Sequence, residues 1–269
     1  MRIIGVDFTS APRKAKPITV AHGELRAGTL RVLAIEPLYD FAAFEALLAR
    51  PGPWTGGFDF PFGLPLELVR DLGWPHSWKR LVGYCRGLTR AELRARFDAY
   101  RAARPAGAKY PHRATDRPAG SSSPMKLVNP PVALMFHEGA PRLAAAGVHV
   151  PGLADGDRRR VALEAYPGML ARAVTRASYK SDSRSLQTPA REAARREIVA
   201  ALERGRHALK TSVSFDTRTM RRQLLDDASG DSLDAVLCAV QAGWAAARAG
   251  WGLPRHIPRC EGWIASAVA

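Results

Sequence analysis

Short runs of apolar residues near the N-terminus alternate with polar positions in the manner of β-strands. The predicted strands cover residues 2–8, 17–22 and 29–35. Glycine-containing turns separate them, and links this short predict an antiparallel meander. Residues 40–48 have helical periodicity, with Asp40 as the cap and Pro51 after the end, and a strand through Asp59 follows. The chain is therefore predicted to open in the order β-β-β-α-β.

The remaining pattern is mainly helical. Residues 64–104 predict two or three helices, whereas 105–126 are too rich in proline and glycine for regular structure. A basic loop of that length tends to be functional or mobile. Later predictions are a helix at 130–146, a strand holding Glu164, and helices at 167–174, 189–205, 218–227 and 231–249. We expect one α/β domain over residues 1–269, with a helical and basic-loop insertion at about 64–146.

The positive charge is concentrated in two segments. The chain has 269 residues and a formal net charge of +15. Residues 76–126 carry 12 Lys and Arg against 3 Asp and Glu, and residues 176–222 carry 12 against 5. Clustered arginine predicts a polyanion partner such as DNA or RNA. A general preference for arginine would explain the choice of arginine over lysine, but it explains the clustering less well. The candidate nucleic-acid contacts are Arg113, Arg117, Lys126 and Lys180.

Cysteine usage and the N-terminus bear on the location of the protein. Three cysteines occur, and none has the Cys-x-x-Cys spacing, so neither a disulfide framework nor a zinc knuckle is indicated. The chain starts directly on a strand without a signal peptide, and no apolar run reaches the length of a bilayer span. We expect a cytoplasmic protein with no membrane partner.

Five carboxylates interrupt apolar segments, and they are the strongest chemical signal in the chain. They are Asp7, Asp59, Glu164, Asp231 and Asp234. An acid among strand hydrophobics loses hydration and needs a compensating partner. Several converging acids repel one another unless they are protonated or bridged by a cation. A divalent metal site would account for all five residues together.

Each acid also has a local explanation. Aspartate is common before turns, which would explain Asp7 and Asp59. Glu164 could form an ion pair with one of the three arginines that precede it by several residues. Asp231 follows a glycine and is a candidate N-cap, which puts Asp234 in the first helical turn, where the helix dipole favours an anion. The i, i+3 spacing of this pair nevertheless places both on one helix face.

The predicted chemistry is metal-dependent hydrolysis of a phosphodiester. Carboxylate oxygens suit Mg²⁺ or Mn²⁺ better than Zn²⁺. Such ions can orient a water and stabilise the attacking and leaving oxygens. All five acids are candidate metal ligands and catalytic residues. Lys180 is a candidate contact to the scissile phosphate, although a solvated loop lysine is the simpler explanation.

Several short motifs resemble a known family. They are Gly5-Val6-Asp7-Phe8-Thr9-Ser10, Phe58-Asp59-Phe60-Pro61-Phe62-Gly63-Leu64-Pro65, Arg113-Ala114-Thr115-Asp116, Glu164-Ala165-Tyr166-Pro167, Tyr179-Lys180, Asp231-Ser232-Leu233-Asp234-Ala235 and Glu261-Gly262-Trp263-Ile264. In this order they resemble the domain-of-unknown-function 429 family, described as predicted nucleases of RNase H-like fold. The resemblance implies an RNase H-like mixed sheet in the order β-β-β-α-β-α-β-α with flanking helices. It puts Asp7 on the first strand, Asp59 on the fourth, and Asp231 or Asp234 on the last helix.

Two other functions remain open at this point. A nucleic-acid-binding protein without catalysis would have the same basic segments. A phosphotransferase of the actin and sugar-kinase type shares the implied core, but no glycine follows Phe8 to let backbone amides approach a phosphate. A substrate with two-fold symmetry would favour a homodimer.

Overall fold

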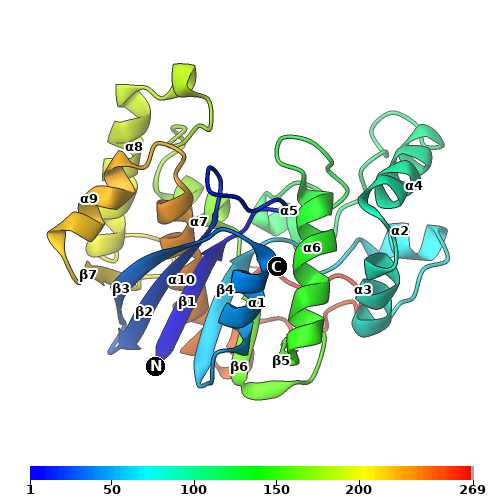
Figure 1. Cartoon of the computed structure of the whole chain (residues 1–269), viewed down its shortest axis with the longest axis horizontal. Helices are drawn as coiled ribbons and strands as arrows, with labels where there is room; N and C mark the ends of the chain where they lie inside the picture. Colours follow the sequence, from blue (N-terminus) through cyan, green and yellow to red (C-terminus); the bar gives the residue numbers. More distant parts are fainter. Residues whose placement is uncertain (268–269) are drawn as a thin grey trace.

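The computed structural model describes residues 1–267 as a mixed α/β fold built on one seven-stranded sheet (Figure 1). The strands are β1 (Arg2–Asp7), β2 (Ile18–Arg26), β3 (Thr29–Leu38), β4 (Trp54–Asp59), β5 (Val148–His149), β6 (Asp157–Glu164) and β7 (Ser212–Phe215). Their order across the sheet is β5-β6-β4-β1-β2-β3-β7. β1, β2 and β3 form the antiparallel meander that the sequence predicted, and β4 and β6 continue the sheet parallel to β1.

Ten α-helices accompany the sheet within the described residues. They are α1 (Phe41–Ala49), α2 (Leu66–Asp71), α3 (Trp78–Arg86), α4 (Arg90–Ala102), α5 (Asp116–Ala119), α6 (Val132–Ala146), α7 (Pro167–Val174), α8 (Pro189–Glu203), α9 (Arg218–Asp226) and α10 (Asp231–Ala246). Asp40 caps α1 by accepting a hydrogen bond of 2.8 Å from the Ala43 backbone, as predicted. Among these helices, none combines the length and apolar character needed to cross a bilayer.

The sheet separates two hydrophobic cores. α1, α3, α4 and α6 pack on one face, where Val6 and Phe58 are fully buried. α7, α8, α9 and α10 pack on the other, with Ile3 buried against α10 (Figure 1). Because successive side chains of a strand point to opposite faces, Gly5 and Asp7 share the α10 side with Ile3.

Two strand glycines let α10 lie directly against the sheet. Gly5 and Gly57 are register partners on β1 and β4. A Cβ atom on Gly5 would lie 2.0 Å from the backbone oxygen of Ala235, and one on Gly57 would lie 2.4 Å from that of Cys238. Glycine inside a strand marks such a close backbone approach. This contact places the first turns of α10 close to the ends of β1 and β4.

The structure differs from the sequence prediction in a few local places. The loop expected to be irregular over residues 105–126 contains the short helix α5. Glu164 is the last residue of β6, not an interior one. The two-residue β5 and the four-residue β7 were not predicted, because strands this short have too little periodicity to detect.

Candidate metal centre

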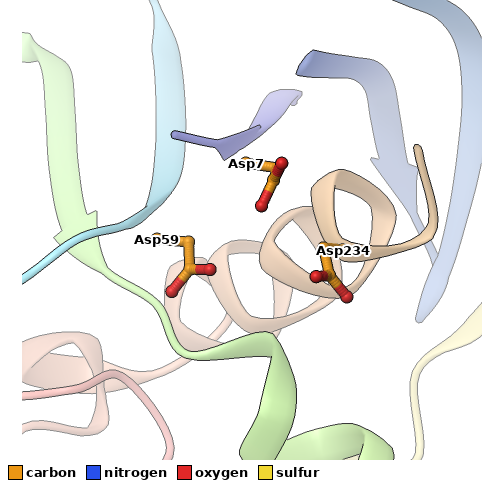
Figure 2. Close-up of side chains that lie close together, drawn as sticks. All are labelled: Asp7, Asp59 and Asp234. Carbon is orange, nitrogen blue, oxygen red and sulfur yellow. The ribbon is translucent and has the colours of Figure 1, made fainter. Parts of the chain in front are cut away.

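Three of the predicted acids meet at one edge of the sheet. Asp7 and Asp59 are register partners at the ends of the parallel strands β1 and β4. Asp234, in the first turn of α10, faces them (Figure 2). One carboxylate oxygen from each residue lies within 4.8 Å of those of the other two. The three residues come from elements far apart in the sequence, so the tertiary fold alone creates this acidic cluster.

The acidic cluster is under electrostatic strain in the metal-free protein. Burial, and then the charges of Asp234 and Asp231, raise the pKa of Asp7 well above its ordinary value. Burial and the charge of Asp234 raise the pKa of Asp59 to about 7. Within residues 1–267, the structure shows no hydrogen bond to the side chain of either residue. Their oxygens are therefore available to a cation, which would relieve the repulsion.

Asp234 is held by two neighbours that precede α8. Its side chain is fully buried and accepts a hydrogen bond of 2.5 Å from the Tyr179 hydroxyl. The ammonium group of Lys180 donates to its other oxygen. Burial alone would lower the pKa of Lys180, but the charge of Asp234, together with Tyr179, Asp7 and the hydrogen bond to Asp234, outweighs burial and raises that pKa well above its ordinary value. Lys180 is therefore a permanent cation beside the acidic cluster.

Gly230 makes room for Lys180. It is the N-cap residue of α10 and has a left-handed backbone with φ of 79°. A Cβ atom there would lie 2.7 Å from the Cβ of Lys180. The prediction that Asp231 caps this helix is therefore wrong, because the cap position belongs to Gly230 and Asp231 is the first helical residue.

Asp231 pairs with a lysine instead of joining the acidic cluster. Lys16, in the β1–β2 connection, contacts Asp231 at 2.8 Å and Asp182 at 2.7 Å. Of the two acids at the start of α10, the described structure thus brings only Asp234 within ligand distance of Asp7 and Asp59. The remaining role of Asp231 is to anchor the β1–β2 connection beside the acidic cluster.

Glu164 also lies outside the acidic cluster, and strand register explains why. It pairs with Phe58, one residue before Asp59, so it points to the opposite face of the sheet. There its oxygens accept hydrogen bonds of 2.7 and 2.6 Å from the Arg113 guanidinium. The backbone of Phe62 donates a third, at 2.9 Å. The partner of this acid comes from the insertion and not from the three arginines that precede it.

Arg113 is a structural residue, which corrects its expected role as a phosphate contact. Its side chain is only 2% exposed. Its guanidinium nitrogens donate to Glu164, to Asp116 and to the backbone of Glu261. All five of its N–H groups are used, and none is free for a phosphate. Of the other expected basic contacts, Arg117 is exposed and Lys126 is partly buried.

The same buried network fastens the C-terminal segment to the insertion. Glu261 accepts hydrogen bonds of 2.7 Å from the Leu66 backbone and 2.8 Å from the Ala114 backbone. The hydroxyl of Thr115 accepts one of 3.0 Å from the Ile264 backbone. The insertion is thereby fixed to the sheet edge that carries the acidic cluster.

A recess opens beside the acidic cluster, and both basic segments contribute to it. Its volume is about 420 Å³. Asp59 and Glu164 belong to its lining, together with Ser121 and Ser122 from the first basic segment and residues 176–180 from the second. Arg176 and Lys180 of the second segment bring positive charge next to the carboxylates, whereas the first segment contributes the two serines and the neutralised Arg113.

A comparison with protein families covers nearly the whole chain. Residues 5–259 match the model of a protein family of unknown function, DUF429. The chain belongs to the DUF429 family. Searches of curated proteins and of solved structures gave no match. In this DUF429 protein the motif residues form two groups. One holds Asp7, Asp59, Asp234 and Lys180, and the other is the buried network around Arg113.

Sequence reasoning did not identify the roles of two residues that shape the DUF429 site, Lys16 and Tyr179. Lys16 was one of several basic residues near the start, and nothing marked it as the partner of Asp231. Tyr179 appeared only as part of the Tyr179-Lys180 motif and was given no role, although it donates a hydrogen bond to Asp234. The glycines two residues before Asp7 and Asp59 were the one usable signal, because they indicate a helix packed against those strands.

Proposed function

We propose that this protein is a metal-dependent nuclease with an RNase H-like core. The observation that carries the proposal is the convergence of Asp7, Asp59 and Asp234, whose carboxylate oxygens lie within 4.8 Å of one another. Three like-charged carboxylates in a partly buried site lower the stability of the fold, and the pKa values of Asp7 and Asp59 are raised there. A reaction that requires a bound cation would explain why the protein has these three carboxylates together.

The topology supports the RNase H-like part of the proposal. Along the chain, β1, β2, β3, α1 and β4 follow the β-β-β-α-β order that the resemblance implied, and β2 is antiparallel to β1 and β3. The acids occupy the first strand, the fourth strand and the last long helix, which are the expected positions. The insertion α2–α6 is the main addition to that core.

The acidic cluster fits Mg²⁺ or Mn²⁺ by its ligand chemistry. Carboxylate oxygens are hard ligands, and within residues 1–267 no cysteine or histidine joins them. Asp7, Asp59 and Asp234 would hold the metal. When bound, it would supply charge stabilisation at the phosphate and activate a water.

The residues around the acidic cluster favour a phosphate-bearing substrate. Lys180 keeps a positive charge beside the carboxylates, with its side chain 42% exposed. Arg172 and Arg176 line the neighbouring recess and are exposed. These groups are placed to attract a phosphodiester toward carboxylates that would otherwise repel it. The phosphotransferase alternative receives no such support, because residues 8–17 lack the glycine that a phosphate loop needs.

A cleavage assay with a matched pair of variants tests the proposal. Labelled single strands, duplexes, RNA–DNA hybrids and junctions are incubated with Mg²⁺ or Mn²⁺, or with EDTA. We expect metal-dependent cleavage by the native protein and by Asp155→Asn, whose side chain is 84% exposed and lies outside the acidic cluster. We expect none by Asp7→Asn. Cleavage that persists in Asp7→Asn would overturn the proposal, and binding without cleavage in the native protein would favour a non-catalytic nucleic-acid-binding protein.

A further inference from the structure

The recess beside the acidic cluster has two unlike walls. The insertion provides an apolar wall that includes Pro130, Val132 and Met135. The other wall comes from Tyr166 at the N-cap of α7, from Arg172 within α7 and from Arg176 after it. Asp59 belongs to the same recess, so a group bound there is next to the acidic cluster.

The aromatic and cationic wall is pre-organised. The Arg172 guanidinium lies 5.1 Å from the centre of the Tyr166 ring, and it donates a hydrogen bond of 3.1 Å to the Tyr166 hydroxyl. It also donates to the backbone oxygens of Ala119 and Gly120 at 2.9 and 3.1 Å. These bonds connect α7 to the insertion. Aromatic rings and guanidinium planes are the surfaces on which unpaired bases stack.

We infer that the recess receives one unpaired nucleotide of the nucleic-acid strand, adjacent to the phosphate that lies at the acidic cluster. This inference rests on the proposed function and specifies its substrate. A volume of about 420 Å³ is at the lower end of ligand pockets and suits a single base and sugar. The apolar wall suits the faces of a base, and the exposed Arg176 suits its phosphate.

The shape of the site then sets the substrate class. A paired base must leave the helix before it can enter such a recess, and unstacking and unpairing cost free energy. In single strands, flaps and bulges the nucleotide is already unpaired, so its binding does not require this free energy. The protein is therefore specific for unpaired nucleotides and discriminates against continuous duplex.

Two tryptophan variants provide a matched test. Ala177 lines the recess and is exposed, so Ala177→Trp fills the recess from its rim without entering the core. Ala173 is exposed on α7 and is not part of the lining, which makes Ala173→Trp the control. Ser122→Trp repeats the block from the insertion, because Ser122 also lines the recess and is exposed. Binding of a fully paired duplex and of the same duplex with one bulged nucleotide is measured in EDTA at one salt concentration.

We expect the native protein and Ala173→Trp to bind the bulged duplex about tenfold more tightly than the paired one, because one additional stacked base contributes about that much to the affinity. We expect Ala177→Trp and Ser122→Trp to lose this preference while they keep their affinity for the paired duplex. Equal binding of the two duplexes by the native protein, or a preference retained in both blocked variants, overturns the inference. Absence of metal-dependent cleavage with the preference intact would instead contradict only the proposed hydrolysis.

Discussion

Gly5 and Gly57 are register partners two residues before Asp7 and Asp59, and α10 packs directly on both glycines. The same helix carries Asp234. The close contact between helix and sheet therefore determines the separation of the three carboxylates. A change at either glycine acts on the acidic cluster without touching its side chains.

Substitution of Gly5 tests this coupling. In Gly5→Ala the new Cβ would lie 2.0 Å from a backbone oxygen of α10, so the helix must shift. We expect the free energy of unfolding to fall by about 2 kcal/mol or more, with a loss of metal binding. The control is Gly83→Ala, because a Cβ at this position in α3 meets nothing within 4 Å. A Gly5→Ala protein with native stability in urea would contradict the packing argument.

Lys180 places a positive charge beside the acidic cluster. Its substitution is expected to change metal affinity and the rate of cleavage in opposite directions. In Lys180→Met the negative charge of Asp234 is no longer compensated. We expect the affinity for Mn²⁺ to rise roughly tenfold by calorimetric titration, because a competing positive charge within a few ångströms is gone. We expect cleavage to slow at saturating metal. A lower Mn²⁺ affinity, with Lys79→Met unchanged, would show that Lys180 instead supports the metal.

The raised pKa of Asp59 predicts a pH dependence of stability. Burial and the charge of Asp234 raise this pKa from the ordinary 3.8 to about 7. Between those values the folded state holds a proton that the unfolded state releases, so this carboxyl makes the metal-free protein less stable as the pH rises. We expect Asp59→Asn to be more stable than the native protein at pH 8 by about 1–3 kcal/mol, with the difference vanishing near pH 4. Denaturant titrations in EDTA that show Asp59→Asn to be the less stable protein at pH 8 would refute the assignment.

The pair Arg113–Glu164 predicts a strong non-additivity. Both side chains are almost fully buried. Arg113→Met leaves two carboxylates buried without their partner, and we expect it to cost about 3–5 kcal/mol of stability. Adding Glu164→Gln should recover part of that loss, since one of the uncompensated charges is removed. Unfolding free energies of the two single variants and the double variant check this, and simple additivity would contradict the contact.

The sequence was sufficient for much of the fold but for only part of the candidate site. The first strand and α7 were predicted nearly to the residue, because their periodicity is unambiguous. The other two strands of the meander were predicted to be present, but they end four and three residues later than expected. Asp7 and Asp59 were predicted to belong to one acidic site, and the structure places them side by side at the ends of two paired strands. The position of Glu164 could not be predicted. A one-residue difference in register reverses the face of a strand residue, and no sequence pattern fixed the register of β6 against β4.

The charge pattern was a poor guide to the roles of individual residues. Both basic segments do reach the recess beside the acidic cluster. Arg113 was nevertheless assigned to a phosphate, although the fold uses it to neutralise Asp116 and Glu164. Whether an arginine is buried in an ion pair depends on tertiary contacts that lie far away in sequence.

The most direct test of the acidic cluster is calorimetric titration of Mn²⁺ into the native protein, Asp7→Asn and Asp155→Asn, with each variant shown to be folded. Our account predicts binding by the native protein and Asp155→Asn, and an affinity at least roughly tenfold weaker for Asp7→Asn. Equal Mn²⁺ affinity in all three proteins would mean that Asp7, Asp59 and Asp234 do not hold a divalent cation, and the proposed nuclease would lose its basis.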